Sequence, residues 1–266
     1  MKLVRIAPTN PADRTLEPTP SGSKESLGLD PTTGAETFVL RRREDHQPPS
    51  DRRGKLEYHT CHEQSFLLRG ACDFDGWYQW RSLGYMMHPP YWWHPSGYRF
   101  EGGGMTLVKL DKPVDFFLRD VPENWDGREW IEPSAPHWCR NRTVQNAWLD
   151  GIPWEPVYLA GGEPAGFDAK HVWDDVETGW STWLMRAPAG WRGRAGWRDG
   201  DGGDELYVLS GSLTLALDRT ITLAEGGYYY DPERILAGGE DDHSDTGFVA
   251  VRWTSGGPWR LPPIRL

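Results

Sequence analysis

An internal repeat constrains the fold of this 266-residue chain more than any other feature of its sequence. The segment SFLLRG, which ends at Gly70, returns as LYVLSG ending at Gly211, an offset of 141 residues. GYMMHPP, beginning at Gly84, returns as GYYYDPE from Gly227, and GMTLVKL returns as GFVAVRW, both at an offset of 143. Unrelated strand-rich segments seldom keep order and spacing in this way, so the pattern predicts an internal duplication.

Both copies consist of short apolar runs separated by turn residues, which is typical of β-strands. The 31 glycines and 22 prolines favour the same interpretation. We therefore predict an all-β protein with two tandem barrel or jelly-roll domains. Residues 1–35, rich in Pro, Ser, Thr and Gly, are expected to form an irregular arm, followed by a first domain over 36–120, a connector over 121–177 and a second domain over 178–266.

Charge and cysteine content exclude several kinds of partner. The formal net charge is −10, which opposes binding to polyanions, so we expect no nucleic acid and no membrane as partner. The three cysteines, Cys61, Cys72 and Cys139, show no CxxC spacing, which argues against a disulfide framework. Without an apolar signal region or a run of about 18 apolar residues, a cytoplasmic location is expected.

The stretch YHTCHEQSFLLRG places two histidines and a glutamate directly before an apolar run. His59 stands four residues before Glu63, and a further histidine, His94, ends the segment GYMMHPPYWWH. Because alternate side chains of each strand point into a barrel, distant strands can aim imidazoles and a carboxylate at one point. Two histidines and one carboxylate with open coordination positions suit Fe(II) and accommodate Mn(II).

These motifs resemble the two signatures of the cupin family, G–x5–HxH–x3or4–E–x6–G and a later one with Gly, Pro and a final His. The matching positions are His59, Glu63, Gly70, Gly84, Pro89 and His94. Glu57 stands where the first signature has its first histidine, which is a departure. The resemblance covers most of both halves and implies a bicupin, closest in texture to ChrR-like cupins.

The resemblance implies a divalent metal held by His59, Glu63 and His94, with Fe(II) preferred and Mn(II), Ni(II) or Zn(II) as alternatives. Glu57 would be a further ligand, a general base or the partner of an arginine. Tyr85 is the second candidate catalytic residue.

Several neighbouring side chains have two interpretations. A slip of one residue would make His62 the ligand in place of His59 and would turn Cys61 inward; otherwise His62 faces solvent from the turn. His88 lies either on the outer surface or at the mouth of the barrel. Four aromatic residues either wall the substrate pocket or pack in the core, namely Tyr58, Tyr85, Trp92 and Trp93.

The second copy lacks the same donors. Asp204 replaces the glutamate, and Gly200 stands where the paired histidine belongs. The segment PERILAGG supplies no counterpart of His94. We expect the second domain to be structural or ligand-shaping, without a metal.

Two classes of function fit these features. The first is a metal-dependent enzyme acting on a small aromatic or apolar organic substrate, as an oxygenase or else as a redox-neutral isomerase, cyclase or lyase on a carbonyl compound. The second is a non-catalytic sensor that binds a metal or a ligand. The resemblance also implies a homodimer.

Overall fold

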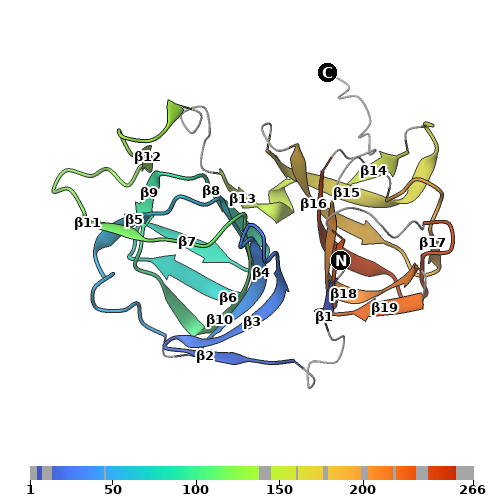
Figure 1. The fold of residues 1–266 in the computed structure, drawn as a ribbon, viewed down its shortest axis with the longest axis horizontal. Helices are drawn as coiled ribbons and strands as arrows, with labels where there is room; N and C mark the ends of the chain where they lie inside the picture. The colour runs from blue at the N-terminus through green and yellow to red at the C-terminus, as the bar shows by residue number, and fades with distance from the viewer. Residues whose placement is uncertain are drawn as a thin grey trace. The chain divides into compact units, whose positions relative to one another are not determined.

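The computed structural model describes residues 5–7, 14–44, 46–137, 145–159, 161–175, 179–198, 203–217, 220–231 and 239–255. Cys139, Gly200 and the segment following Pro232 lie outside these residues. The chain divides into two compact units, described separately below: an N-terminal unit, Thr15–Asp150, and a C-terminal unit, Met1–Arg14 with Gly151–Leu266. Strands dominate both units (Figure 1), so the all-β prediction is confirmed. No helix within the described ranges is long and apolar enough to cross a membrane.

The N-terminal unit contains two antiparallel sheets. The strands of the larger sheet are β2 (Glu17–Thr19), β3 (Gly22–Leu29), β4 (Glu36–Arg42), β6 (Glu63–Phe74), β7 (Tyr78–Arg81), β8 (Gly84–His88), β10 (Arg99–Leu110) and β13 (Gln145–Trp148). Their order is β13-β8-β6-β10-β4-β3-β2, with β7 paired to β6. The smaller sheet has the order β11-β5-β9-β12, from β11 (Phe117–Asp120), β5 (Lys55–Tyr58), β9 (Trp92–Pro95) and β12 (Trp130–Ile131).

The C-terminal unit repeats this arrangement. Its strands are β1 (Arg5–Ala7), β14 (Glu155–Tyr158), β15 (Pro164–Asp174), β16 (Trp180–Ala187), β17 (Trp191–Arg192), β18 (Asp204–Ala216), β19 (Thr220–Ala224), β20 (Tyr228–Asp231), β21 (His243–Ser244) and β22 (Phe248–Ser255). A short 3₁₀ helix, η3 (Leu149–Gly151), precedes β14. The main order, β1-β20-β18-β22-β16-β15-β14, matches that of the larger N-terminal sheet strand for strand.

The glycines that revealed the repeat occupy equivalent positions in the two units. Gly70 on β6 has a φ of 97°, and Gly211 on β18 has a φ of 74°. A Cβ atom would collide with the carbonyl oxygen of Gly103 at the first position and of Gly247 at the second. Each glycine therefore allows a neighbouring strand to approach at the same point of the sheet.

Two parts of the expected domain organisation differ in the structure. Residues 1–35 are not irregular throughout, because β3 pairs with β4 from Gly22↔Arg42 to Leu29↔Glu36, and β1 pairs with β20. Antiparallel pairing with an adjacent strand overrides the weak strand propensity of a Ser- and Gly-rich segment. The expected connector is likewise divided, since β12 and β13 belong to the N-terminal unit and β14 and β15 to the C-terminal unit.

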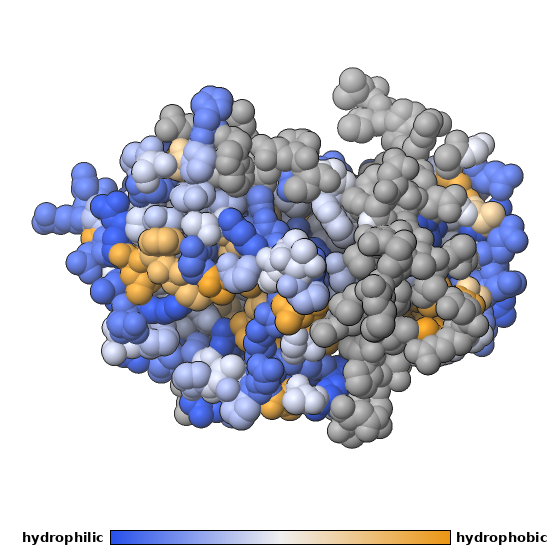
Figure 2. All heavy atoms as spheres, viewed as in Figure 1, coloured by the Kyte–Doolittle hydropathy of each residue, from blue (hydrophilic) through white to orange (hydrophobic). Residues whose placement is uncertain are grey.

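The outer edge of the smaller sheet is apolar. Phe117 and Leu118 on β11 and the preceding Phe116 are 36–44% exposed. Figure 2 shows hydrophobic atoms gathered on this face, over the region where Figure 1 draws β11. An edge strand also presents unpaired backbone groups, so the sheet that carries part of the candidate site ends in an exposed apolar edge.

Candidate functional site

Two pairs of facing residues form the frame of the site. Glu57 on β5 lies directly opposite His94 on β9 in the smaller sheet. Glu63 on β6 lies directly opposite His88 on β8 in the larger sheet. Side chains directly opposite in an antiparallel pair point to the same face, so each sheet presents one carboxylate beside one imidazole.

Three imidazoles converge inside the N-terminal unit. Nitrogen atoms of His59, His88 and His94 all lie within 4.8 Å of one another, and the three residues are buried. Nε2 of His59 is 3.4 Å from Nε2 of His94, and the rings of His88 and His94 stack at 3.8 Å. This trio joins the predicted ligands His59 and His94 with His88, which was expected on the outer surface or at the mouth of the barrel.

The carboxylate of Glu63 joins this group through His59. Its Oε2 is 3.2 Å from Nε2 of His59, and its Oε1 accepts a hydrogen bond of 3.0 Å from the hydroxyl of Ser65. The Ser65 bond holds one oxygen, so the other oxygen points toward the imidazoles.

Backbone carbonyls orient two of the imidazoles. Nδ1 of His59 is 2.9 Å from the carbonyl oxygen of Cys61, and Nδ1 of His94 is 3.2 Å from that of Pro95. A carbonyl oxygen only accepts, so each Nδ1 donates, and a neutral ring then has its lone pair on Nε2. Both Nε2 atoms face each other, the arrangement in which imidazoles bind a metal.

The electrostatics of this group are strongly coupled. Burial lowers the pKa of His59, but hydrogen bonds to the Cys61 side chain and to Glu63 raise it well above the usual value. Burial raises the pKa of Glu63, but the His59 imidazolium outweighs this and lowers it to about 2. Burial, with the charges of His88 and His59, holds the pKa of His94 well below its usual range. In the metal-free protein these shifts favour an ion pair between His59 and Glu63 beside a neutral His94.

The donor set fits a divalent metal ion. Both ring nitrogens of His88 are buried without a hydrogen-bond partner, and an orphaned buried polar atom is costly. Three imidazole nitrogens with the Glu63 oxygen form a mixed nitrogen and oxygen set, which suits Fe(II), Mn(II) or Zn(II).

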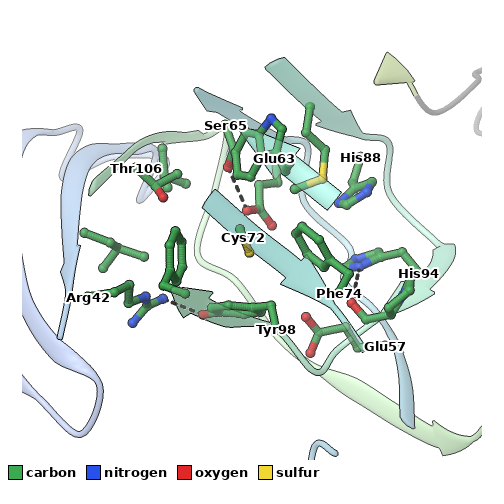
Figure 3. Close-up of a pocket in the computed structure, with 16 residues that line it drawn as sticks. Arg42, Glu57, Glu63, Ser65, Cys72, Phe74, His88, His94, Tyr98 and Thr106 are labelled. Carbon is green, nitrogen blue, oxygen red and sulfur yellow. Dashed lines mark hydrogen bonds between the residues drawn. The ribbon is translucent and has the colours of Figure 1, made fainter. Parts of the chain in front are cut away.

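A cavity of about 70 Å³ adjoins the group. Its apolar lining comes from Leu40, Phe74, Trp80, Met86, Phe100 and Val108. Figure 3 shows His88 and His94 on one side of the cavity and Arg42 on the other, where the Arg42 guanidinium donates hydrogen bonds to Tyr98 and Ser21. The cavity thus has an imidazole wall, a cationic wall and apolar sides.

Glu57 lines the same cavity. Its Oε2 forms an ion pair of 3.0 Å with Nη1 of Arg52, which is one of the three roles expected for it. Burial raises the pKa of Glu57 to about 8, in spite of the opposing charges of Arg52 and His59. Its roles as a metal ligand or a general base stay predictions.

The predicted aromatic wall does not line this cavity. Tyr58 and Trp93 are the outward neighbours of the inward residues Glu57 and His94, and Tyr58 stacks on Phe117 at 4.6 Å. Trp93 donates a hydrogen bond of 2.8 Å to Glu132. The alternation of side chains along a strand explains the outcome, because neighbouring positions face opposite sides.

The other two aromatic candidates are also absent from the lining, and for Tyr85 the same alternation explains it. Tyr85 lies on β8, and its neighbour Met86 lines the cavity instead. The buried Tyr85 hydroxyl donates a hydrogen bond of 3.1 Å to Gln64. Trp92 precedes the inward-facing positions of β9 and is absent from the lining as well.

The structure separates the two interpretations of the remaining residues. His62 does not join the imidazole group, since its Nδ1 lies 2.7 Å from Oδ2 of Asp111. It is buried rather than facing solvent. Cys61 packs with Phe38 and Val108, and burial raises the pKa of its thiol.

His88, expected on the outer surface or at the mouth, is fully buried within the group. The sequence held one indication of this position: His88 stands two residues after Met86, and alternate residues of a strand face the same side.

The matching interior of the C-terminal unit holds an arginine. Nε of Arg252 is 2.7 Å from Oδ1 of Asp204, the counterpart of Glu63, and both side chains are buried. The guanidinium also donates to the carbonyl oxygens of Trp197 and Arg198. Within the described residues, the group of three histidines lies in the N-terminal unit. In the C-terminal unit, Arg252 is paired with Asp204 at the matching place.

Comparison with known proteins supports the fold. No family model matches the sequence, and no curated protein matches it. A candidate dioxygenase from Nostoc punctiforme matches with a TM-score of 0.67 at 14% identity, over 99% of this chain and 88% of that chain. A variant of Bacillus subtilis oxalate decarboxylase matches with a TM-score of 0.54 at 14% identity, over 98% and 79% of the two chains.

A third similar structure is a variant of salicylate 1,2-dioxygenase from Pseudoaminobacter salicylatoxidans, with a TM-score of 0.54 at 15% identity over 86% and 74% of the two chains. These structures are cupins with a double-stranded β-helix fold. The predicted fold, two tandem double-stranded β-helix domains, is therefore confirmed. The closer resemblance to ChrR-like cupins stays a prediction.

Proposed function

We propose that this protein is a metal-dependent enzyme that acts on a small organic molecule, with an oxygenase reaction as the first candidate. The observation that carries the proposal is the convergence of His59, His88 and His94, with Glu63 bound to His59, at the wall of a cavity. A divalent metal bound there would supply Lewis acidity and, if it is iron, a redox centre for oxygen chemistry.

The lining of the cavity supports a substrate with an apolar body and one anionic group. Phe74, Trp80 and Phe100 offer aromatic surface, while Arg42 places a positive charge opposite the imidazoles. Such a combination of apolar walls and a few polar groups is typical of small-molecule sites. Glu57 lies close enough to the cavity to serve as a general base, as the sequence suggested.

Oxygenation is the first candidate, because iron with open coordination positions can react with O2. The redox-neutral alternative, an isomerase, cyclase or lyase, would use the same metal as a Lewis acid. A sensor would bind the metal without turnover. The homodimer and the cytoplasmic location expected from the sequence also stay predictions.

The first test is elemental analysis of protein purified without added metal, followed by oxygen uptake of the iron- and manganese-loaded protein with a panel of small aromatic acids. His94→Ala should abolish both metal content and turnover, whereas His171→Ala, on β15 of the C-terminal unit, should leave both unchanged. Full turnover by metal-free His94→Ala would end the proposal. Product formation without oxygen uptake would select the redox-neutral alternative.

A further inference from the structure

A second carboxylate reaches the imidazole group from outside both sequence motifs. Oε1 of Glu129 lies 3.5 Å from Nε2 of His88. The Glu129 side chain is 11% exposed, and both of its oxygens are buried without a hydrogen-bond partner. Both ring nitrogens of His88 are likewise buried without a hydrogen-bond partner. Four polar atoms therefore lack a hydrogen bond at one point beside the site, although Oε1 of Glu129 and Nε2 of His88 lie close to each other.

Strand pairing explains how Glu129 arrives there. β12 pairs with β9 in the register Trp130↔Trp93 and Ile131↔Trp92. Continuing this register by one residue sets Glu129 opposite His94, on the inward side of the sheet. Since Glu57 pairs with His94 from the other side, three neighbouring segments of the smaller sheet each present one polar residue to the site.

The segment that carries Glu129 is held firmly to β9. The backbone N–H of Glu132 donates a hydrogen bond of 2.7 Å to the carbonyl oxygen of Tyr91, and its carboxylate accepts one of 2.8 Å from Trp93. Tyr91 in turn donates its N–H to the carbonyl oxygen of His59 at 2.8 Å. The segment that carries Glu129 is thus connected, through Glu132 and Tyr91, to the backbone of His59.

Leaving these groups unpaired would be costly. A buried carboxylate without a partner destabilises a fold by several kcal/mol, whereas pairing it with a cation removes most of this penalty. The contact of 3.5 Å is longer than a normal hydrogen bond. It nevertheless fits two ligand atoms of one ion, since metal–ligand bonds of about 2.2 Å allow a separation of up to about 4.4 Å. Among the described residues, the three imidazoles have ligand atoms that all lie within 4.8 Å of one another, and each carboxylate lies beside one of them: Glu63 beside His59 at 3.2 Å and Glu129 beside His88 at 3.5 Å.

We propose that Glu129 is an oxygen ligand of the metal, supplied by the segment before β12. The inference rests on the proposed function, because it requires a metal among the three imidazoles. With Glu63 it provides two negative charges, which balance a divalent cation held by three neutral imidazoles. A net neutral, oxygen-containing set favours Fe(II) or Mn(II) over the thiolate type of zinc site.

The test compares three variants with the wild type: Glu129→Gln, His94→Ala and a matched control, Glu123→Gln, at an exposed position of the same segment. Metal affinity is measured by chelator competition with Mn(II), and ligand identity by the visible spectrum of the Co(II)-loaded protein. Glu129→Gln should lower the affinity at least about tenfold and change the Co(II) spectrum. Glu123→Gln should match the wild type.

The outcomes separate this inference from the proposed function. Wild-type affinity and spectrum in Glu129→Gln, with metal binding lost in His94→Ala, would overturn the role of Glu129 and leave the metal site intact. Wild-type metal binding by His94→Ala would overturn the metal site itself. Lower affinity in Glu129→Gln with an unchanged spectrum would show that the residue only positions His88, which also contradicts its role as a ligand.

Thermal melting of the metal-free proteins is the folding control. Glu129→Gln removes a buried carboxylate that has no hydrogen bond, so its melting temperature without metal should equal or exceed that of the wild type. A lower melting temperature would show that Glu129 stabilises the fold by itself and would contradict the proposal.

Discussion

Glu63 and His88 face each other as direct partners across β6 and β8. Because Glu63 is bound to His59, this pairing brings His88 into contact with the group to which the sequence motifs assigned other ligands. His88 is therefore as central to the candidate site as the two histidines of the cupin signatures.

Replacing His88 should weaken metal binding more than replacing any nearby histidine outside the group. His88→Ala is expected to lower metal affinity by more than about 100-fold, since it removes one of three converging nitrogens. His62→Ala, which instead breaks a bond to Asp111, should retain the metal. Calorimetric titration with Mn(II) measures both, and equal affinities would contradict the three-histidine group.

The stability of the metal-free protein should depend on pH through Glu63 and His59. The pKa of Glu63 is lowered from 4.5 to about 2, so its stabilising contribution is present above pH 4.5 and is lost as the pH falls toward 2. The pKa of His59 is raised above 6.5, so its contribution is present below pH 6.5 and is lost as the pH rises through the raised value.

The free energy of unfolding of the wild type should consequently exceed that of Glu63→Gln most clearly between pH 4.5 and 6.5. Urea titrations at a series of pH values, with a chelator present, measure this difference. A difference that is constant from pH 3 to pH 9 would show that the bridge between Glu63 and His59 does not form.

Tyr85 should be dispensable for metal binding and turnover, although the sequence made it a candidate catalytic residue. Tyr85→Phe removes one buried hydrogen bond to Gln64 and should cost about 1 kcal/mol of stability. Activity assays of the metal-loaded variant provide the check. A loss of turnover without a loss of metal would place the hydroxyl in the reaction after all.

Arg252 should matter for folding and not for metal binding. Arg252→Ala leaves the buried carboxylate of Asp204 without its ion pair, which should cost about 3–5 kcal/mol. Arg186→Ala, which breaks a half-exposed pair with Asp168, is the control and should cost no more than about 1 kcal/mol. Chemical denaturation compares the two variants, and similar losses would contradict the structural role of Arg252.

The sequence by itself determined the duplicated β-fold, and it predicted the candidate ligands that lie within motifs. The constant offset of repeated glycines reflects a backbone requirement, since Gly70 and Gly211 occupy conformations and close approaches that other residues do not tolerate. His59, Glu63 and His94 could be identified because local spacing places them at the entrances and ends of strands.

Only the tertiary structure decided which further residues join them. His88 enters the group through its pairing with β6, and Glu129 approaches through the pairing of β12 with β9. Strand register also turned Tyr58, Tyr85 and Trp93 away from the cavity. Pairing partners distant in the chain set this register, and a single residue of slip exchanges the two faces of a strand, so local sequence patterns do not reveal it.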